Sequence, residues 1–267
     1  MAVNELTPRR DPHPLITLSL DVGGTGIKGD TLNVQGTPTA ARVRIPTTYP
    51  LSPQDLVDVF ARIAAERPNF DRVSVGFPGV VRGGAILTAP HFVREGGDGT
   101  PEVPELVKAW DHFKLAEVTA TRLGRPTRVG NDAEVQGMAV VKGKGLEVVL
   151  TLGTGVGSAV FEEGRLGPHL ELAHHPIHKR KTYNEYLGNE ERDRIGEKRW
   201  NRRVMAMIEI VRTLFLFDHL YIGGGNSAHV KGELPADVTL VDNDAGILGG
   251  IRLWEQPAVV THKAAPN

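Results

Sequence analysis

Apolar residues recur along the chain with two spacings, one typical of helices and one typical of strands. Between residues 52 and 68, Leu56, Phe60 and Ile63 fall three or four positions apart after a Ser-Pro start, and Pro68 ends the pattern, which indicates a helix. The same criteria predict helices over residues 106–124, 132–145, 190–217 and 244–254, and strands over 18–22, 27–34, 72–75, 125–129, 148–152, 156–161, 219–222 and 238–242. Strands that alternate with helices in both halves predict an α/β fold.

Two glycine-rich turns interrupt apolar runs in the same way. Residues 18–30, LSLDVGGTGIKGD, contain the G-x-G-x-x-G pattern of a dinucleotide loop, but the next residues alternate as in a strand and stop at Gly-Thr-Pro. A dinucleotide loop needs a helix at this point and an acidic residue roughly 20 positions on, and the segment ARVRIPTT contains no acid. We therefore expect this loop to join two strands.

The second turn, in VVLTLGTGVGSAVF at residues 148–161, also runs from strand to strand through Gly-Thr-Gly. The repeat predicts a duplicated architecture, in which the backbone N–H groups of two hairpin turns face phosphate groups across a cleft. Two ordinary glycine-rich hairpins without a ligand are the alternative.

Composition and charge argue against several kinds of partner, cross-link and targeting segment. The chain has 267 residues and a net charge of −1, so we expect neither a nucleic-acid nor a membrane partner. The absence of cysteine excludes disulfides and thiolate metal sites and fits a cytoplasmic location. No segment resembles a signal peptide or a membrane span, and residues 1–14 are expected to form a disordered lead.

Six motifs in order, LDVGGTGIKG, GFPG, VGNDAE, TLGTGVGSA, ELAHH and YIGGGNS, resemble the ROK family of sugar kinases. KTYNEYLGNEERDRIGEKRWNRR resembles the corresponding segment of its polyphosphate/ATP-dependent glucokinases and glucomannokinases. The resemblance implies a duplicated actin-like (ribonuclease-H-like) ATPase fold with two lobes around a cleft. We expect a small N-terminal α/β lobe over residues 15–131 and a larger C-terminal α/β lobe over 132–267, whose last helix packs back on the small lobe.

The same resemblance implies phosphoryl transfer from inorganic polyphosphate, ATP or both to the 6-hydroxyl of glucose, with mannose as a further candidate. A strictly ATP-dependent sugar kinase and a non-catalytic sugar-sensing regulator are the alternatives. ROK regulators carry a DNA-binding domain ahead of the kinase fold, and the fold here is expected to begin by about residue 15. We therefore favour an enzyme, as a homodimer or a monomer.

Asp132 is the candidate general base, because it stands where a strand turns into a helix and a carboxylate can face a cleft. In the family the matching Asp deprotonates the 6-hydroxyl, and the matching Asn, here Asn131, binds sugar hydroxyls. Capping of the following helix by either residue is the alternative. The resemblance adds four sugar-binding residues, Gly79, Glu171, His174 and Glu185. This sequence departs from the family pattern at Ala173, which replaces a glycine, and at His91, where the family often has asparagine.

The phosphate end of the expected site begins at Asp21, an acid in an apolar strand. A carboxylate there needs a partner, and Mg²⁺ held through water is the candidate, with a turn-capping role as the alternative. By resemblance the phosphates are lined by Gly23, Gly24, Thr25, Lys28, Gly153, Thr154 and Gly155, and the nucleotide by Gly223, Gly224 and Gly225. The alternatives are that Lys28 is a solvated strand lysine and that the three glycines form an ordinary strand-to-helix turn.

Residues 179–203 contain nine basic residues against five acids, a local excess in a nearly neutral chain. Lys198, Arg199, Arg202 and Arg203 are the candidate track for a polyphosphate chain, and a solvated helix face is the alternative. The nearby histidines, His169, His174, His175 and His178, have the density of a metal site. No structural zinc is expected, because the family's zinc sites use cysteines that this chain lacks.

Overall fold

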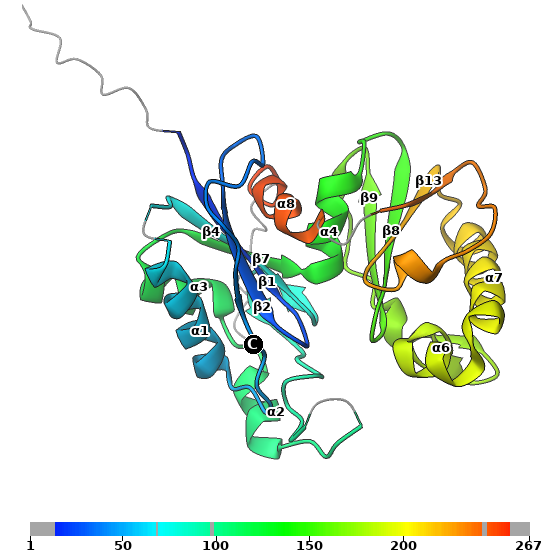
Figure 1. Ribbon diagram of the computed structural model, residues 1–267, viewed down its shortest axis with the longest axis horizontal. Helices are drawn as coiled ribbons and strands as arrows, with labels where there is room; N and C mark the ends of the chain where they lie inside the picture. The colour runs from blue at the N-terminus through cyan, green and yellow to red at the C-terminus, as the bar shows by residue number, and fades with distance from the viewer. Residues whose placement is uncertain (1–13, 68, 97–98, 242–244, 257–267) are drawn as a thin grey trace, which may run out of the picture.

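Two five-stranded sheets, one in each half of the chain, form the frame of the molecule (Figure 1). The computed structural model describes residues 14–67, 69–96, 99–241 and 245–256, so the expected lead at residues 1–14 lies almost wholly outside the described residues. The first sheet has the order β3-β2-β1-β4-β7, with strands β1 (Thr17–Val22), β2 (Ile27–Leu32), β3 (Val43–Ile45), β4 (Arg72–Phe77) and β7 (Thr127–Asn131). The second has the order β10-β9-β8-β13-β14, with strands β8 (Leu146–Leu152), β9 (Val156–Glu162), β10 (Arg165–Leu166), β13 (His219–Gly223) and β14 (Val238–Leu240).

The two sheets correspond strand for strand. In each, a glycine hairpin joins the first two strands in antiparallel fashion, β1 to β2 and β8 to β9. In each, the next strands are parallel to the first strand of the hairpin, β4 and β7 in one sheet and β13 and β14 in the other. The predicted strand-turn-strand loops and the predicted duplication are therefore confirmed.

Helices cover the outer sides of the sheets and fill the space between them. Helices α1 (Pro53–Ala65), α2 (Pro104–Trp110) and α3 (Leu115–Leu123) belong to the first half, and α5 (Tyr183–Leu187), α6 (Asn189–Ile195) and α7 (Glu197–Phe215) to the second. Helices α4 (Asp132–Val140) and α8 (Ala245–Arg252) lie side by side between the two sheets (Figure 1). Short elements complete the described chain: strands β5 (Val81–Arg82), β6 (Ala85–Ile86), β11 (Pro176–His178) and β12 (Lys181–Thr182), and the 3-10 helices η1 (Leu172–His174) and η2 (Ser227–His229).

Glycines allow α8 to approach its neighbours closely. A Cβ atom on Gly249 would stand 1.6 Å from the carbonyl oxygen of Val135 in α4, and one on Gly250 would stand 2.2 Å from the Ser19 hydroxyl in β1. The Ser19 hydroxyl donates a 2.9 Å hydrogen bond to the carbonyl of Ile247. Helix α8 is therefore packed against both α4 and the first sheet.

Two expected helices are each divided in two. The helix expected over residues 106–124 breaks between α2 and α3, because His112 adopts a left-handed φ of 54° and the Phe113 carbonyl accepts a hydrogen bond from the Ile86 N–H. The helix expected over residues 190–217 breaks between α6 and α7 at Gly196, whose φ is 80°. In both places a distant contact or a left-handed residue overrides the local apolar spacing.

Candidate functional site

The turn from β7 into α4 is built around a buried asparagine. The Asn131 side chain accepts a hydrogen bond from the Ala133 N–H at 2.9 Å and donates one to the Gly79 carbonyl at 3.0 Å. Glu134 completes a capping box by accepting from the Asn131 N–H at 3.0 Å. Asn131 therefore caps α4, which was the alternative to sugar binding, and at most one N–H of its amide is left for a ligand.

Asp132 is the first residue of α4, and one of its carboxylate oxygens accepts from the Ala133 N–H at 2.8 Å. Burial is the main reason that the pKa of Asp132 is raised, to about 7. The negative charges of Asp21 and Glu171 raise it further, whereas the Ala133 N–H and the charge of His91 lower it. Asp21, His91 and Glu171 come from three distant segments of the chain, and their charges all act on this one carboxyl. The raised pKa suits a general base at neutral pH.

His169 lies between two carboxylates. Its Nδ1 is 2.8 Å from the Glu134 carboxylate and its Nε2 is 3.3 Å from the Glu171 carboxylate. These two contacts raise the pKa of His169 to about 9. The sequence offers His169 only as a candidate metal ligand and predicts no role for Glu134, although the Asn-x-x-Glu spacing at 131–134 is the signature of a capping box.

The first glycine turn carries an ion pair. Lys28 in β2 lies 3.2 Å from the carboxylate of Asp21 in β1, and both side chains are partly exposed. Lys28 is therefore not a solvated strand lysine, and Asp21 has a protein partner in addition to any cation. The carbonyls of Gly23 and Gly24 accept hydrogen bonds from the hydroxyls of Thr47 and Tyr49, and Thr25 is exposed at the tip of the turn.

The second glycine turn and the Gly223–Gly224–Gly225 segment are linked by one side chain that the sequence did not single out. Asn226 is buried, donates to the Gly153 carbonyl at 3.1 Å from its amide, and donates from its N–H to the Leu152 carbonyl at 2.8 Å. Arg192 of α6 donates in turn to the Asn226 amide oxygen.

The turns themselves are shaped by glycine. Gly224 has a φ of 81°, and a Cβ there would stand 2.4 Å from the Leu152 carbonyl oxygen. The N–H of Gly153 donates to the Gly155 carbonyl at 2.9 Å, and Thr154 between them is exposed. The two predicted cofactor-binding segments are thus brought together.

Two further predicted sugar ligands, Glu185 and His174, have exposed side chains. Glu185 is exposed and forms a capping box with Thr182, whose hydrogen bonds lower the pKa of the Glu185 carboxyl. His174 is exposed at the end of η1. At the β7–α4 turn, the Gly79 carbonyl accepts a hydrogen bond from Asn131, and the charge of Glu171 acts on Asp132. The sugar-binding roles of Glu185 and His174 stay predictions.

The basic segment divides into paired and exposed members. Glu191, whose side chain is 8% exposed, forms ion pairs with Arg194 at 2.6 Å, Arg203 at 2.7 Å and Lys181 at 2.8 Å. Arg194 first, and then Lys181 and Arg203, hold the pKa of Glu191 well below its usual range. The expectation that Arg203 lines an open track is thereby weakened, because its charge is already paired. Lys198, Arg199 and Arg202 are exposed on α7 and have no side-chain partner among the described residues.

The described residues contain neither a metal-binding cluster nor a membrane-spanning helix. Within residues 14–67, 69–96, 99–241 and 245–256, no group of three or more His, Cys, Asp or Glu side chains has an arrangement that could hold a metal ion. Over the same ranges, no helix is long and apolar enough to cross a membrane.

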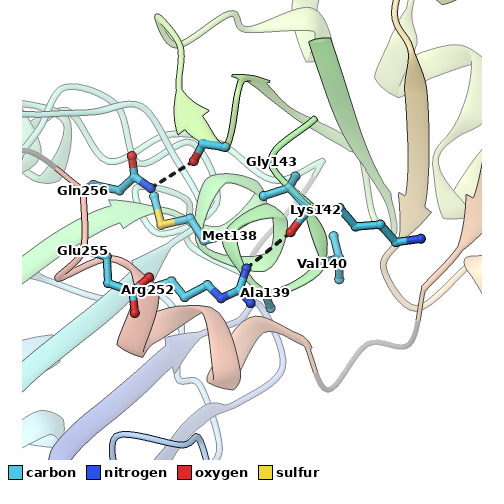
Figure 2. A pocket seen from close by; sticks show the side chains of 10 residues that line it. Met138, Ala139, Val140, Lys142, Gly143, Arg252, Glu255 and Gln256 are labelled. Carbon is cyan, nitrogen blue, oxygen red and sulfur yellow. Dashed lines mark hydrogen bonds between the residues drawn. The ribbon is translucent and has the colours of Figure 1, made fainter. Parts of the chain in front are cut away.

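A cavity of about 420 Å³ lies at the opposite end of α4 from Asp132, and Figure 2 shows the side chains around it. Arg252 reaches across it to the Val141 carbonyl at 3.3 Å, and the Gln256 amide donates to the Gly164 carbonyl at 3.4 Å. Because it opens at the C-terminal end of α4, this cavity is separate from the Asp132 site.

The chain is similar in sequence to known proteins over most of its length. The model of the ROK family matches residues 17–183. The polyphosphate glucokinase of Mycobacterium tuberculosis is 26% identical over 246 residues, which cover 86% of this chain and 88% of that protein. The polyphosphate glucokinase of Mycobacterium leprae is 26% identical over 258 residues, which cover 91% of this chain and 75% of that protein.

Among solved structures, the inorganic polyphosphate/ATP-glucomannokinase of an Arthrobacter species aligns with a TM-score of 0.76 and 28% identity, over 91% of this chain and all of that one. A ROK family glucokinase from Streptomyces griseus, solved with glucose and AMPPNP, aligns with a TM-score of 0.70 and 18% identity, over 89% of this chain and 98% of that one. These likenesses confirm the predicted actin-like, two-lobed α/β fold.

Proposed function

The chain belongs to the ROK family, and we propose that it is a hexokinase that transfers a phosphoryl group from inorganic polyphosphate or ATP to the 6-hydroxyl of glucose. The observation that carries the proposal is the Asp132 carboxyl at the start of α4, with one oxygen held by the Ala133 N–H and with a pKa raised to about 7 by burial and by the charges of Asp21 and Glu171. The likeness to mycobacterial polyphosphate glucokinases and to a polyphosphate/ATP-glucomannokinase supports the choice of sugar and donors, with mannose as a second substrate.

In the proposed reaction Asp132 accepts the proton of the 6-hydroxyl as the sugar oxygen forms a bond to the terminal phosphorus of the donor. The bond from that phosphorus to its bridging oxygen breaks, and the shortened donor keeps the electron pair. The Asp132 carboxylate oxygen that is not held by the Ala133 N–H is the atom that accepts the proton.

Residues around Asp132 would bind and orient the sugar. Glu171 supplies a carboxylate acceptor for a sugar hydroxyl, and the Asn131 amide fixes the Gly79 carbonyl. His174 and Glu185, which are exposed here, would bind the sugar from the C-terminal lobe, and closure would bring them toward Gly79 and Asn131 of the N-terminal lobe. We place the division between the lobes at residues 131 and 132, with α8 packed across it.

The phosphate groups of the donor would lie against the two glycine turns, with Lys28 as the cation of the first. Mg²⁺ in kinase sites is held by one or two carboxylates together with substrate phosphates and water, and the single carboxylate of Asp21 fits that pattern. When bound, the ion would neutralise charge on the transferred phosphoryl group.

A strictly ATP-dependent sugar kinase is the second candidate. The observation that favours it is the pairing of Arg203, Arg194 and Lys181 with Glu191, which reduces the basic surface open to a polyphosphate chain.

Steady-state kinetics with glucose and mannose, each against polyphosphate and ATP with Mg²⁺, tests the proposal. We expect Asp132→Asn to lower kcat by about 10²- to 10⁴-fold with either donor, the usual contribution of a general base. The matched control is Asp111→Asn, an exposed carboxylate at the end of α2. Near-normal turnover in Asp132→Asn would exclude its role as base, and activity with ATP alone would favour the second candidate.

A further inference from the structure

A histidine connects the turn that carries Asp132 to the carboxylate proposed to bind sugar. His169 precedes η1, and its side chain is 14% exposed, between Glu134 of α4, which is 8% exposed, and Glu171, which is 32% exposed. The distances are 2.8 Å from Nδ1 to Glu134 and 3.3 Å from Nε2 to Glu171. Both ring nitrogens therefore face carboxylate oxygens.

This geometry determines the protonation state of the ring. A neutral imidazole has one N–H donor, whereas the imidazolium has two, and an ionised carboxylate can only accept. Both contacts are hydrogen bonds only when the ring carries its second proton. The positive charge then faces one acid from α4 and one acid from its own segment, and these are the charged groups that act on it.

The second carboxylate oxygen of Glu134 has a different hydrogen-bond partner. It accepts the Asn131 N–H at 3.0 Å and so fixes the first turn of α4, where Asp132 is located. Through Glu134 and His169, the position of Glu171 is therefore tied to the same turn as Asp132. Because the Glu171 charge also acts on Asp132, a shift of Glu171 would alter both sugar binding and the base.

We propose that His169, as an imidazolium, is the positioning residue that keeps Glu171 ionised and oriented to accept a hydrogen bond from the sugar. The inference rests on the proposed hexokinase function and adds to it a residue that determines affinity for the sugar without touching the phosphoryl donor. The raised pKa of His169, about 9, means that the bridge persists at neutral pH and is lost as the pH rises through about 9.

The first experiment compares His169→Gln with the wild type. Glutamine is similar in length but uncharged, and its single amide group cannot donate to both carboxylates from the ring positions. We expect KM for glucose to rise by about 10-fold or more, the effect of losing one charge-assisted hydrogen bond. KM for ATP should stay within about twofold, because no donor contact is removed. The matched control is His178→Gln, an exposed histidine of β11 that packs on Tyr186.

The second experiment measures the ring directly. The ¹⁵N signals of the His169 imidazole, identified as those missing in His169→Gln, should report two protons up to about pH 8. Glu134→Gln removes one charge while its amide oxygen can still accept from Asn131, so it should lower the imidazole pKa and raise KM for glucose without unfolding α4. This variant also decides the question if His169→Gln does not fold.

An ordinary titration of His169 near pH 6.5, or an unchanged KM for glucose in both variants, would overturn the inference while leaving the kinase function intact. An equal loss of kcat with both donors at unchanged KM would also overturn it, because it would indicate a general structural role. If the wild type phosphorylates no hexose, the proposed function fails, and the sugar-binding role of His169 is overturned with it.

Discussion

Asp132 has one carboxylate oxygen held by a backbone N–H and a pKa of about 7, caused mainly by burial. A general base must be deprotonated to act, so we expect kcat/KM for glucose to fall as the pH decreases through about 7 and to level off above it. A pH–rate profile from pH 5 to 8.5 with ATP as donor measures this dependence. A profile that is flat across pH 7 would contradict the assignment of Asp132.

For some residues, the position in the sequence identifies a candidate but does not reveal its role. The Asn131–Asp132 pair was identified from its position after a strand, but only its contacts show that Asn131 caps the helix and leaves Asp132 as the residue with a free carboxylate oxygen. For Glu185, the family resemblance implies sugar binding, and the structure adds that its carboxylate takes part in the capping box of α5.

Among the elements, Glu191 of α6 is linked to α7 through Arg203 and to the β11–β12 hairpin through Lys181, and it also pairs with Arg194 of its own helix. We expect Glu191→Gln to lower the unfolding free energy by about 2 kcal/mol, less than for a fully buried pair because Lys181 and Arg194 are partly exposed. Thermal unfolding should show Tm lowered by about 5 °C for a chain of this size. The matched control, Glu190→Gln, removes an exposed neighbouring charge and should leave Tm unchanged.

The pH dependence of this effect has a definite sign. Because the folded state lowers the pKa of Glu191, its stabilising contribution is present above the unfolded pKa near 4.5 and is lost as the pH falls below it. The difference in Tm between wild type and Glu191→Gln should therefore shrink at acidic pH. An equal difference at pH 4 and pH 7 would show that the ion pairs do not cause it.

Helix α7 presents three exposed cations, at i, i+1 and i+4 positions, that have no side-chain partner in the part of the chain that the structure describes. If Lys198, Arg199 and Arg202 contact polyphosphate, their combined change to Gln should raise KM for polyphosphate by about 10-fold and make its salt dependence shallower. KM for ATP should change by less than about twofold, because the three phosphates of ATP would end at the glycine turns, whereas a polymer would continue past them. The control neutralises three exposed cations elsewhere: Arg62, Lys108 and Arg165. Equal losses with both donors would exclude a polyphosphate track.

At the scale of the whole molecule, α4 and α8 lie side by side between the two sheets, and the proposed sugar ligands come from both halves of the chain (Figure 1). Closure on the sugar would bring His174 and Glu185 of the C-terminal lobe toward Gly79 and Asn131 of the N-terminal lobe and exclude water from the phosphoryl donor. We expect small-angle scattering to give a smaller radius of gyration at saturating glucose, and Glu171→Gln to need more glucose for the same change. An unchanged radius at saturating glucose would contradict closure.

The two glycine hairpins, the strand-to-helix turn at Asp132 and the duplicated α/β order could be predicted from the sequence, since they depend on short-range spacing and on glycine conformation. Which charged groups form pairs depends instead on tertiary packing. His169 is 35 residues from Glu134, and Arg203 is 12 residues from Glu191. A count of basic residues along the sequence does not distinguish paired cations from exposed ones, because ion pairing and burial depend on how separate segments pack. For the same reason, the breaks at His112 and Gly196 follow from backbone conformation and distant contacts that apolar periodicity does not encode.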